Sequence, residues 1–192
     1  MTDLDRIAAA SAILVDPEGA DFVHHATAWS VGGGGWITSW DPEVPVPASL
    51  RLLLATEGSV HEIGDWEQDG EIVGFTSSAT ADIDLILSTS DELHKRQRLT
   101  AVGYPSVIDH PAFALSRSSL DCERYFPYLC PWTIEGHLAL FSVDAGYLTG
   151  GSYRGMRGGP VFAADGSVVG ILASGDAGAP PLSRFLRIAA SS

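Results

Sequence analysis

The stretch Gly155-Met156-Arg157-Gly158-Gly159-Pro160-Val161-Phe162, with DGSVVGILASG at 165–175 soon after it, is the most informative part of this sequence. The three glycines of the loop allow backbone angles and close approaches that other residues do not. Asp165-Gly166 then joins two apolar runs and is the strongest short hairpin signal in the chain. The stretch therefore predicts a glycine-rich loop that leads into a β-hairpin.

Apolar runs of strand length recur along the rest of the chain, separated by turn residues. We expect strands at Ala12–Val15, Thr27–Val31, Trp36–Trp40, Leu50–Thr56, Glu71–Thr76, Ile83–Leu87, Leu99–Tyr104, Pro111–Leu115, Thr133–Phe141, Pro160–Ala163, Val168–Ser174 and Phe185–Ile188. About a dozen short strands indicate an all-β barrel or sandwich. Asp3–Ala10 favours a short helix, Ser183–Ala190 fits a strand or a helix, and the polar stretch Ser88–Gln97 divides the chain into halves.

Four segments together resemble the trypsin-like serine proteases, and most of all the small bacterial members of that family. The loop matches the family's G-x-S-G-G-P nucleophile motif, except that Arg157 stands at the serine position. Trp36-Ile37-Thr38 resembles the approach to the catalytic histidine, whose position is taken by Asp41. Asp82-Ile83-Asp84-Leu85-Ile86 resembles the segment of the triad aspartate, which would make Asp82 that acid. Val102-Gly103-Tyr104-Pro105 resembles the strand that opens the second barrel.

The resemblance implies two six-stranded antiparallel β-barrels, an N-terminal one over 1–90 and a C-terminal one over 91–192, with the former active site between them. It also implies that the N–H groups of Gly155 and Arg157 are the remnant of an oxyanion hole. The remaining residues of the nucleophile loop would be Met156, Gly158, Gly159 and Pro160.

The residues at the triad positions do not form a serine protease triad. A guanidinium offers no lone pair for attack on a carbonyl, and a carboxylate is a poor base for a serine hydroxyl. We therefore expect a catalytically inactive homologue that binds a protein or an extended peptide. The alternatives are a hydrolase that uses other residues and a structural subunit with a filled cleft. No spacing connects Ser39, Ser152 or any of the six histidines into a catalytic set, and surface or strand-edge roles are expected for the histidines.

Arg157 is expected to fold back over the site and pair with Asp41, Asp82 or both, because two neighbouring carboxylates would otherwise repel one another. In the alternative arrangement Arg157 points to solvent and Asp41 caps a turn before Pro42.

Composition limits the partners. The formal net charge is −13, from 24 acidic and 11 basic residues, so binding of a phosphate backbone is not expected. No apolar run reaches the length of a membrane span or a secretory signal, and we expect a cytoplasmic protein. Cys122 and Cys130 are expected to be reduced thiols, and the sequence predicts neither a cofactor nor a metal site.

Overall fold

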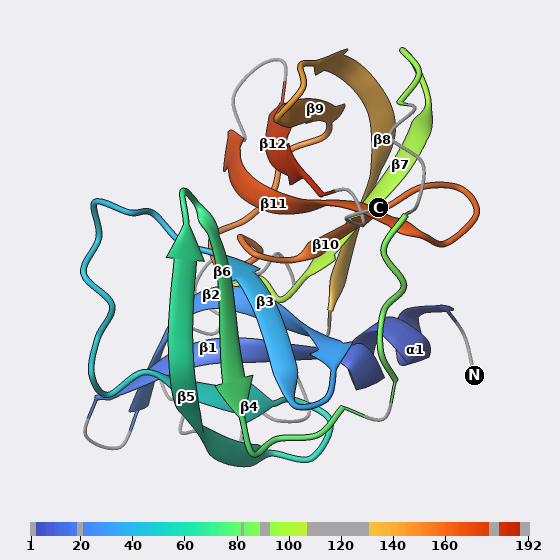
Figure 1. Ribbon diagram of the computed structural model, residues 1–192. Helices are drawn as coiled ribbons and strands as arrows, with labels where there is room; N and C mark the ends of the chain where they lie inside the picture. Colours follow the sequence, from blue (N-terminus) through green and yellow to red (C-terminus); the bar gives the residue numbers. More distant parts are fainter. Residues whose placement is uncertain are drawn as a thin grey trace, which may run out of the picture.

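The computed structural model describes residues 3–18, 21–81, 83–88, 93–106, 131–176 and 181–188. Its strands form two closed six-stranded barrels, which lie one above the other in Figure 1. One short helix, α1 (Asp3–Ala10), precedes the strands in the part of the chain that is described. The predicted all-β architecture of two barrels is confirmed, and so is the N-terminal helix.

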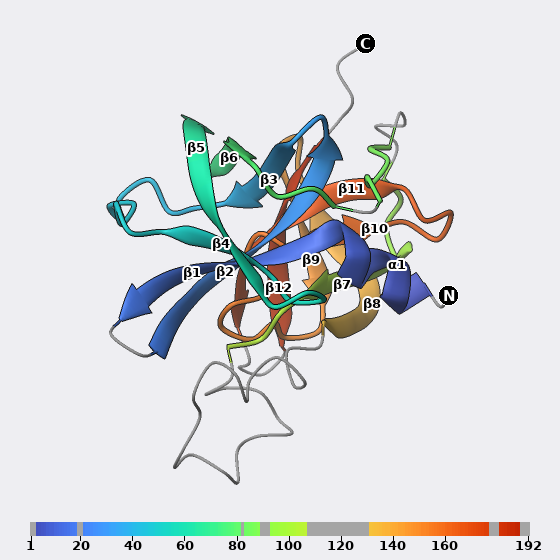
Figure 2. The same cartoon turned by 90° about the horizontal axis from the view of Figure 1, so that it is seen from below.

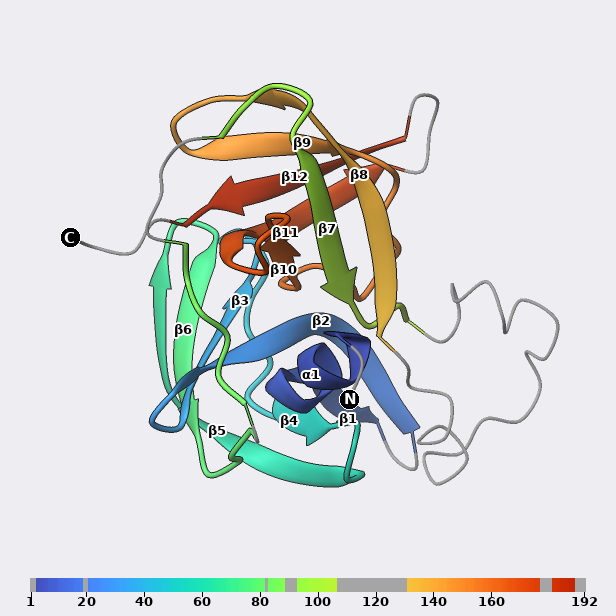
Figure 3. The same ribbon diagram turned by 90° about the vertical axis from the view of Figure 1, so that its right-hand side faces the viewer.

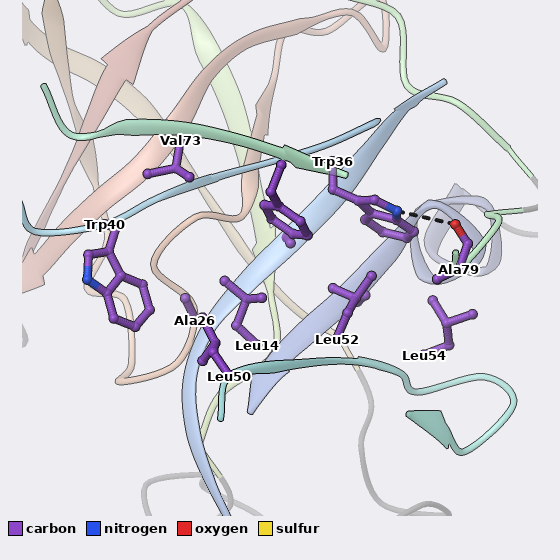
Figure 4. Close-up of a cluster of buried hydrophobic side chains, with 12 residues drawn as sticks. Leu14, Ala26, Trp36, Trp40, Leu50, Leu52, Leu54, Val73 and Ala79 are labelled. Carbon is purple, nitrogen blue, oxygen red and sulfur yellow. Dashed lines mark hydrogen bonds between the residues drawn. The ribbon is translucent and has the colours of Figure 1, made fainter. Parts of the chain in front are cut away.

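The first barrel has the strand order β1-β2-β3-β6-β5-β4, with every neighbouring pair antiparallel. Its strands are β1 (Ser11–Glu18), β2 (Asp21–Gly32), β3 (Gly35–Ser39), β4 (Arg51–Leu54), β5 (Ser59–Asp69) and β6 (Ile72–Ser77). Alternate residues of a strand point to the same face, so Leu14, Leu52 and Val73 meet inside the barrel. Figure 4 shows this core, with Trp36 Nε1 donating a hydrogen bond of 3.4 Å to the carbonyl of Ala79.

The second barrel has the equivalent order β10-β11-β12-β9-β8-β7. Its strands are β7 (Arg98–Gly103), β8 (Trp132–Phe141), β9 (Ala145–Thr149), β10 (Pro160–Phe162), β11 (Val168–Asp176) and β12 (Leu182–Arg187). Phe185, Leu138 and Leu148 fill its interior, and Met156 from the glycine-rich loop is buried with them. The loop at 155–159 is thus anchored in the second barrel by an apolar side chain.

The two barrels also share buried contacts. Trp29 of β2 packs with Val102, Phe162, Val168 and Ile171 of the second barrel, and all five are buried. Figures 2 and 3 show β2 running beneath the strands of the second barrel. This apolar contact fixes β2 and β3 against the loop that carries Arg157.

Several local expectations are corrected. Strands β5 and β9 were not expected. At the C-terminus, Leu182–Arg187 is a strand, which agrees with the strand expected there and not with its helical alternative. Ile83–Leu87 is not a strand, because its only ladder contact among the described residues is an isolated bridge from Leu87 to Val168.

Some expectations concern residues outside the described part of the chain. These are the strand at Pro111–Leu115, the state of Cys122 and Cys130, and the division at residue 90. Within the described ranges, no helix is both long and apolar enough to cross a bilayer.

Candidate functional site

The glycine-rich loop is clamped between the two barrels by backbone hydrogen bonds. Thr27 of β2 donates from its N–H to the carbonyl of Arg157 at 2.7 Å and from its hydroxyl to the carbonyl of Gly155 at 2.9 Å. On the other side, Gly158 N–H donates to the carbonyl of Leu172 in β11 at 2.7 Å. These bonds to opposite barrels fix the direction in which the Arg157 side chain leaves the loop.

Gly158 is required by this close approach. Its φ is +85°, which L-residues adopt at a cost, and a Cβ here would collide with the Thr27 carbonyl and the Thr38 hydroxyl. Gly155 has φ +89°, and a Cβ would lie 2.7 Å from Ser106 N and 2.8 Å from Cε1 of His24. Both glycines allow the loop to lie directly against its neighbours.

The guanidinium of Arg157 turns toward the first barrel and meets two side chains there. Its Nε donates to the hydroxyl of Ser39 at 3.3 Å, and its terminal nitrogen lies 3.3 Å from Oε2 of Glu71. Ser39 Oγ in turn donates to the carbonyl of Leu172 at 2.6 Å. Arg157 is therefore held across the junction of the two barrels.

Glu71 is shared with a second arginine. Arg184 of β12 places one guanidinium nitrogen 2.9 and 3.0 Å from the two carboxylate oxygens of Glu71. The exposed fractions of the three side chains are similar, 28% for Arg157, 27% for Glu71 and 31% for Arg184. The site is thus a half-buried Arg–Glu–Arg cluster, which we call the cleft cluster (Arg157, Glu71 and Arg184).

The pairing of Arg157 corrects one of the two expected partners, Asp41. Asp41 makes no ion pair with Arg157, although both residues are described; its carboxylate accepts a hydrogen bond of 3.0 Å from Glu43 N–H. Asp41 therefore caps a turn, as in the alternative arrangement, while Arg157 still folds over the site. Burial lowers the pKa of Arg157, and the nearby charges of Glu71 and then Asp41 oppose that effect.

Asp82, the expected triad acid, lies outside the described residues. The segment after it runs along β2 and β11, where Leu85 N–H donates to the Ser30 carbonyl and Asp84 accepts 2.8 Å from Ser30 Oγ. Among the described residues, the acid that the structure brings to Arg157 is Glu71, at the end of the Asp69-Gly70 turn and directly before β6. The sequence could have pointed to Glu71, because this acid stands between the Asp69-Gly70 turn signal and the apolar run that follows. No sequence signal pointed to Arg184.

A small cavity of about 130 Å³ adjoins the cleft cluster, and Asp41, Arg157, His25 and Trp40 are among its lining residues. His25 packs against Trp40 with ring centroids 5.5 Å apart. The lining therefore offers a carboxylate, a guanidinium and two aromatic rings, and a polar side chain of a ligand could form hydrogen bonds with the two charged groups. Among the described residues, no three His, Cys, Asp or Glu side chains gather to hold a metal ion.

His24 lies against the glycine-rich loop, beside Gly155. This corrects the expectation of a surface or strand-edge position for this histidine. Neither of its ring nitrogens contacts solvent, and the backbone groups of Gly155 and Ala26 lie beside the ring without a hydrogen bond of good geometry. Burial, with a smaller effect of the neighbouring His25, lowers the pKa of His24 from 6.5 to about 4. The ring is therefore neutral at physiological pH.

This neutral histidine predicts acid sensitivity. The unfolded chain takes up the proton near pH 6.5 and the folded chain only near pH 4, so the free energy of unfolding should fall as the pH falls between these values. The loss attributable to His24 should reach about 3 kcal/mol and then stop growing below pH 4. Urea unfolding of the parent and of His24→Gln across this range measures it. A parent whose pH dependence equals that of His24→Gln contradicts the prediction, and His137→Gln, at an exposed position, is the control.

Because Glu71 pairs with both Arg157 and Arg184, removing Arg157 should reduce stability only modestly. We expect Arg157→Ala to lower the free energy of unfolding by about 1 kcal/mol, because the ion pair is partly exposed and Arg184 still neutralises Glu71. Removing an arginine that alone neutralised a buried carboxylate would cost about 3 kcal/mol or more. Urea unfolding of Arg157→Ala, Glu71→Gln and the double variant gives the coupling energy, and a coupling of zero contradicts the pairing.

A serine–histidine hydrogen bond does occur away from the loop. Ser59 Oγ lies 2.8 Å from Nε2 of His61 at the start of β5. Glu57 contacts the same hydroxyl at 3.2 Å and does not orient the histidine ring. The arrangement lacks the order of nucleophile, base and acid that a triad requires.

Comparisons with known proteins support the fold and leave the chemistry open. No family model and no curated protein matches the sequence. A solved structure of Glu endopeptidase in complex with MPD superposes with a TM-score of 0.64 at 10% identity, covering 98% of this chain and 90% of that one. The atomic-resolution structure of HBP gives 0.67 at 13% identity, covering 98% and 89%. The chain has the two-barrel fold of the trypsin-like serine proteases.

Proposed function

We propose that the chain is a trypsin-like protein without protease activity that binds an extended peptide or protein segment in the former active-site cleft. The observation that carries the proposal is the guanidinium of Arg157, which occupies the nucleophile loop and is held by Ser39 and Glu71. A side chain that holds its protons and offers no lone pair cannot start acyl transfer.

The nearest hydroxyl does not supply the missing nucleophile. Ser39 is fully buried, donates its proton to the carbonyl of Leu172 and accepts from Arg157. A base in hydrogen-bonding reach is needed to activate such a hydroxyl, and its bonds leave no room for one. The residues around Arg157 therefore support binding and not catalysis.

Two features support peptide binding. Strand β11 pairs with both β10 and β12 up to Ile171, but from Ser174 to Asp176 it pairs only with β12 among the described residues. The N–H groups of Gly155 and Arg157 also have no hydrogen-bond partner among the described residues. An extended peptide can add a strand to such an edge through its main chain, without a catalytic triad.

The charge balance favours a protein partner over a nucleic acid. With 24 acidic and 11 basic residues, the chain repels a phosphate backbone at long range. We further propose that it is a bacterial, cytoplasmic protein in which residues 1–90 and 91–192 each form one barrel, and that its partner regulates or is regulated by it.

Binding to a library of capped octapeptides, measured by fluorescence anisotropy, tests this function. The best binder is then methylated at one backbone nitrogen at a time. We expect every second methylation to weaken binding at least about tenfold and the others to be tolerated, since alternate N–H groups of an added strand face its neighbour. Absence of binders, or a methylation profile without this period of two, contradicts the proposal.

A further inference from the structure

We propose that the cleft cluster recognises an acidic side chain of the bound peptide, and that Glu71 occupies the place of that carboxylate when the cleft is empty. The inference rests on the proposed function, because it needs a peptide along the free edge of β11, that is, the side of Ser174–Asp176 that pairs with no described strand. Arg184 is the principal recognition residue and Arg157 assists it.

Strand register places Arg184 next to the free edge. Arg184 lies directly opposite Ser174 on β11 and directly opposite Tyr147 on β9. Residues paired in this way share one face of the sheet. A peptide added beyond Ser174 therefore presents alternate side chains on the face that carries Arg184.

The distance between that peptide and Arg184 suits two long side chains. The peptide residue opposite Ser174 would be two strand spacings from Arg184, roughly 10 Å between Cα atoms. Ser174 is small and exposed, so it leaves the space above it open. A glutamate of the peptide and the arginine can meet over Ser174.

The cleft cluster has hydrogen-bond donors to spare. Each guanidinium carries five N–H donors, and the acceptors that the structure gives to Arg157 and Arg184 are the Glu71 carboxylate and the Ser39 hydroxyl. The positive charges of Arg157 and Arg184 share the Glu71 carboxylate. The Asp41 carboxylate acts on Arg157 by its charge but forms no ion pair with it. A second carboxylate would find free donors on both guanidiniums.

The overall negative charge also repels an acidic peptide, and the local contacts must outweigh that repulsion. At physiological ionic strength the charges of the outer surface are screened beyond roughly 8 Å. Contacts between a peptide carboxylate and the half-buried arginines act within that distance and are charge-assisted hydrogen bonds.

The test uses a library-selected octapeptide, acetylated and amidated so that its side chains carry the only carboxylates. We expect the parent to bind the Glu form roughly tenfold more tightly than the matched Gln form. Arg184→Gln should bring this ratio close to one. Glu71→Gln should raise the ratio severalfold, because it removes the competing carboxylate. Arg98→Gln removes an ion-paired arginine elsewhere on the second barrel and should leave the ratio unchanged.

A measurement on the unaltered protein covers the case in which a variant does not fold. The Nε–H resonances of Arg184 and Arg157 should shift when the Glu peptide is added and shift much less with the Gln peptide. Peptides that bind with equal affinity in both forms, or a Glu71→Gln variant with the parental ratio, overturn acid recognition and leave peptide binding intact. If no library peptide binds, the proposed function fails and this inference falls with it.

Discussion

Gly158→Ala is expected to lower the free energy of unfolding by roughly 4 kcal/mol, the sum of an unfavourable backbone angle and a collision in a packed site. The added methyl group would strike the Thr27 carbonyl and the Thr38 hydroxyl, which belong to the backbone and core of the first barrel and have little freedom to move. Urea unfolding of the purified variant measures the loss.

Gly166→Ala is the matched control for this substitution. Gly166 has nearly the same φ, +83° against +85°, but a Cβ there would meet no atom within 4 Å. The backbone angle alone should cost about 1 kcal/mol. Equal losses in the two variants would show that the loop does not press against the first barrel.

The second large effect concerns the groups that a serine protease needs and that we propose are missing from this site. Arg157→Ser alone should show no measurable hydrolysis of an activated peptide ester, because Asp41 stands at the position of the base and a carboxylate is a poor base for a serine hydroxyl. Adding Asp41→His supplies a base, and the double variant should exceed the single one at least about a hundredfold, as is usual for general-base catalysis.

Arg157→Ala combined with Asp41→His is the control, since it has the base without the nucleophile. Strong activity from Arg157→Ser alone would contradict this account of the site. It would point to His24 or His25 as a base, since both lie close to the loop.

The fold could be predicted from the sequence because its deciding signals are local. The glycine-rich loop and the Asp165-Gly166 turn are read from consecutive residues, and alternating apolar residues mark most of the strands. Strand β5 was missed because its sequence is mostly polar and its side chains are mostly exposed. Its larger side chains that are partly buried are His61, Ile63 and Trp66. Ile83–Leu87 is as apolar as a strand, but it lies between the barrels and pairs only at Leu87.

The candidate site was predicted in part. Arg157 and its loop were found because the motif is continuous, and an ion pair over the site was expected from charge alone. The triad acid was assigned to Asp82 from a five-residue pattern, and that assignment stays a prediction because Asp82 lies outside the described residues. The pairing of Arg157 with Glu71 was not predicted. Arg184 reaches the same carboxylate from a strand 113 residues away in sequence, and no local pattern reports such a contact.

Labelling by a fluorophosphonate probe tests most directly whether the chain is a protease. The purified protein, incubated with excess probe beside an active serine protease as positive control, should show no adduct by intact mass spectrometry. The expectation follows from the buried, doubly hydrogen-bonded Ser39 and from the arginine in the glycine-rich loop. A stoichiometric adduct on one serine, abolished when that serine alone is replaced by alanine, would contradict the account and identify a working nucleophile.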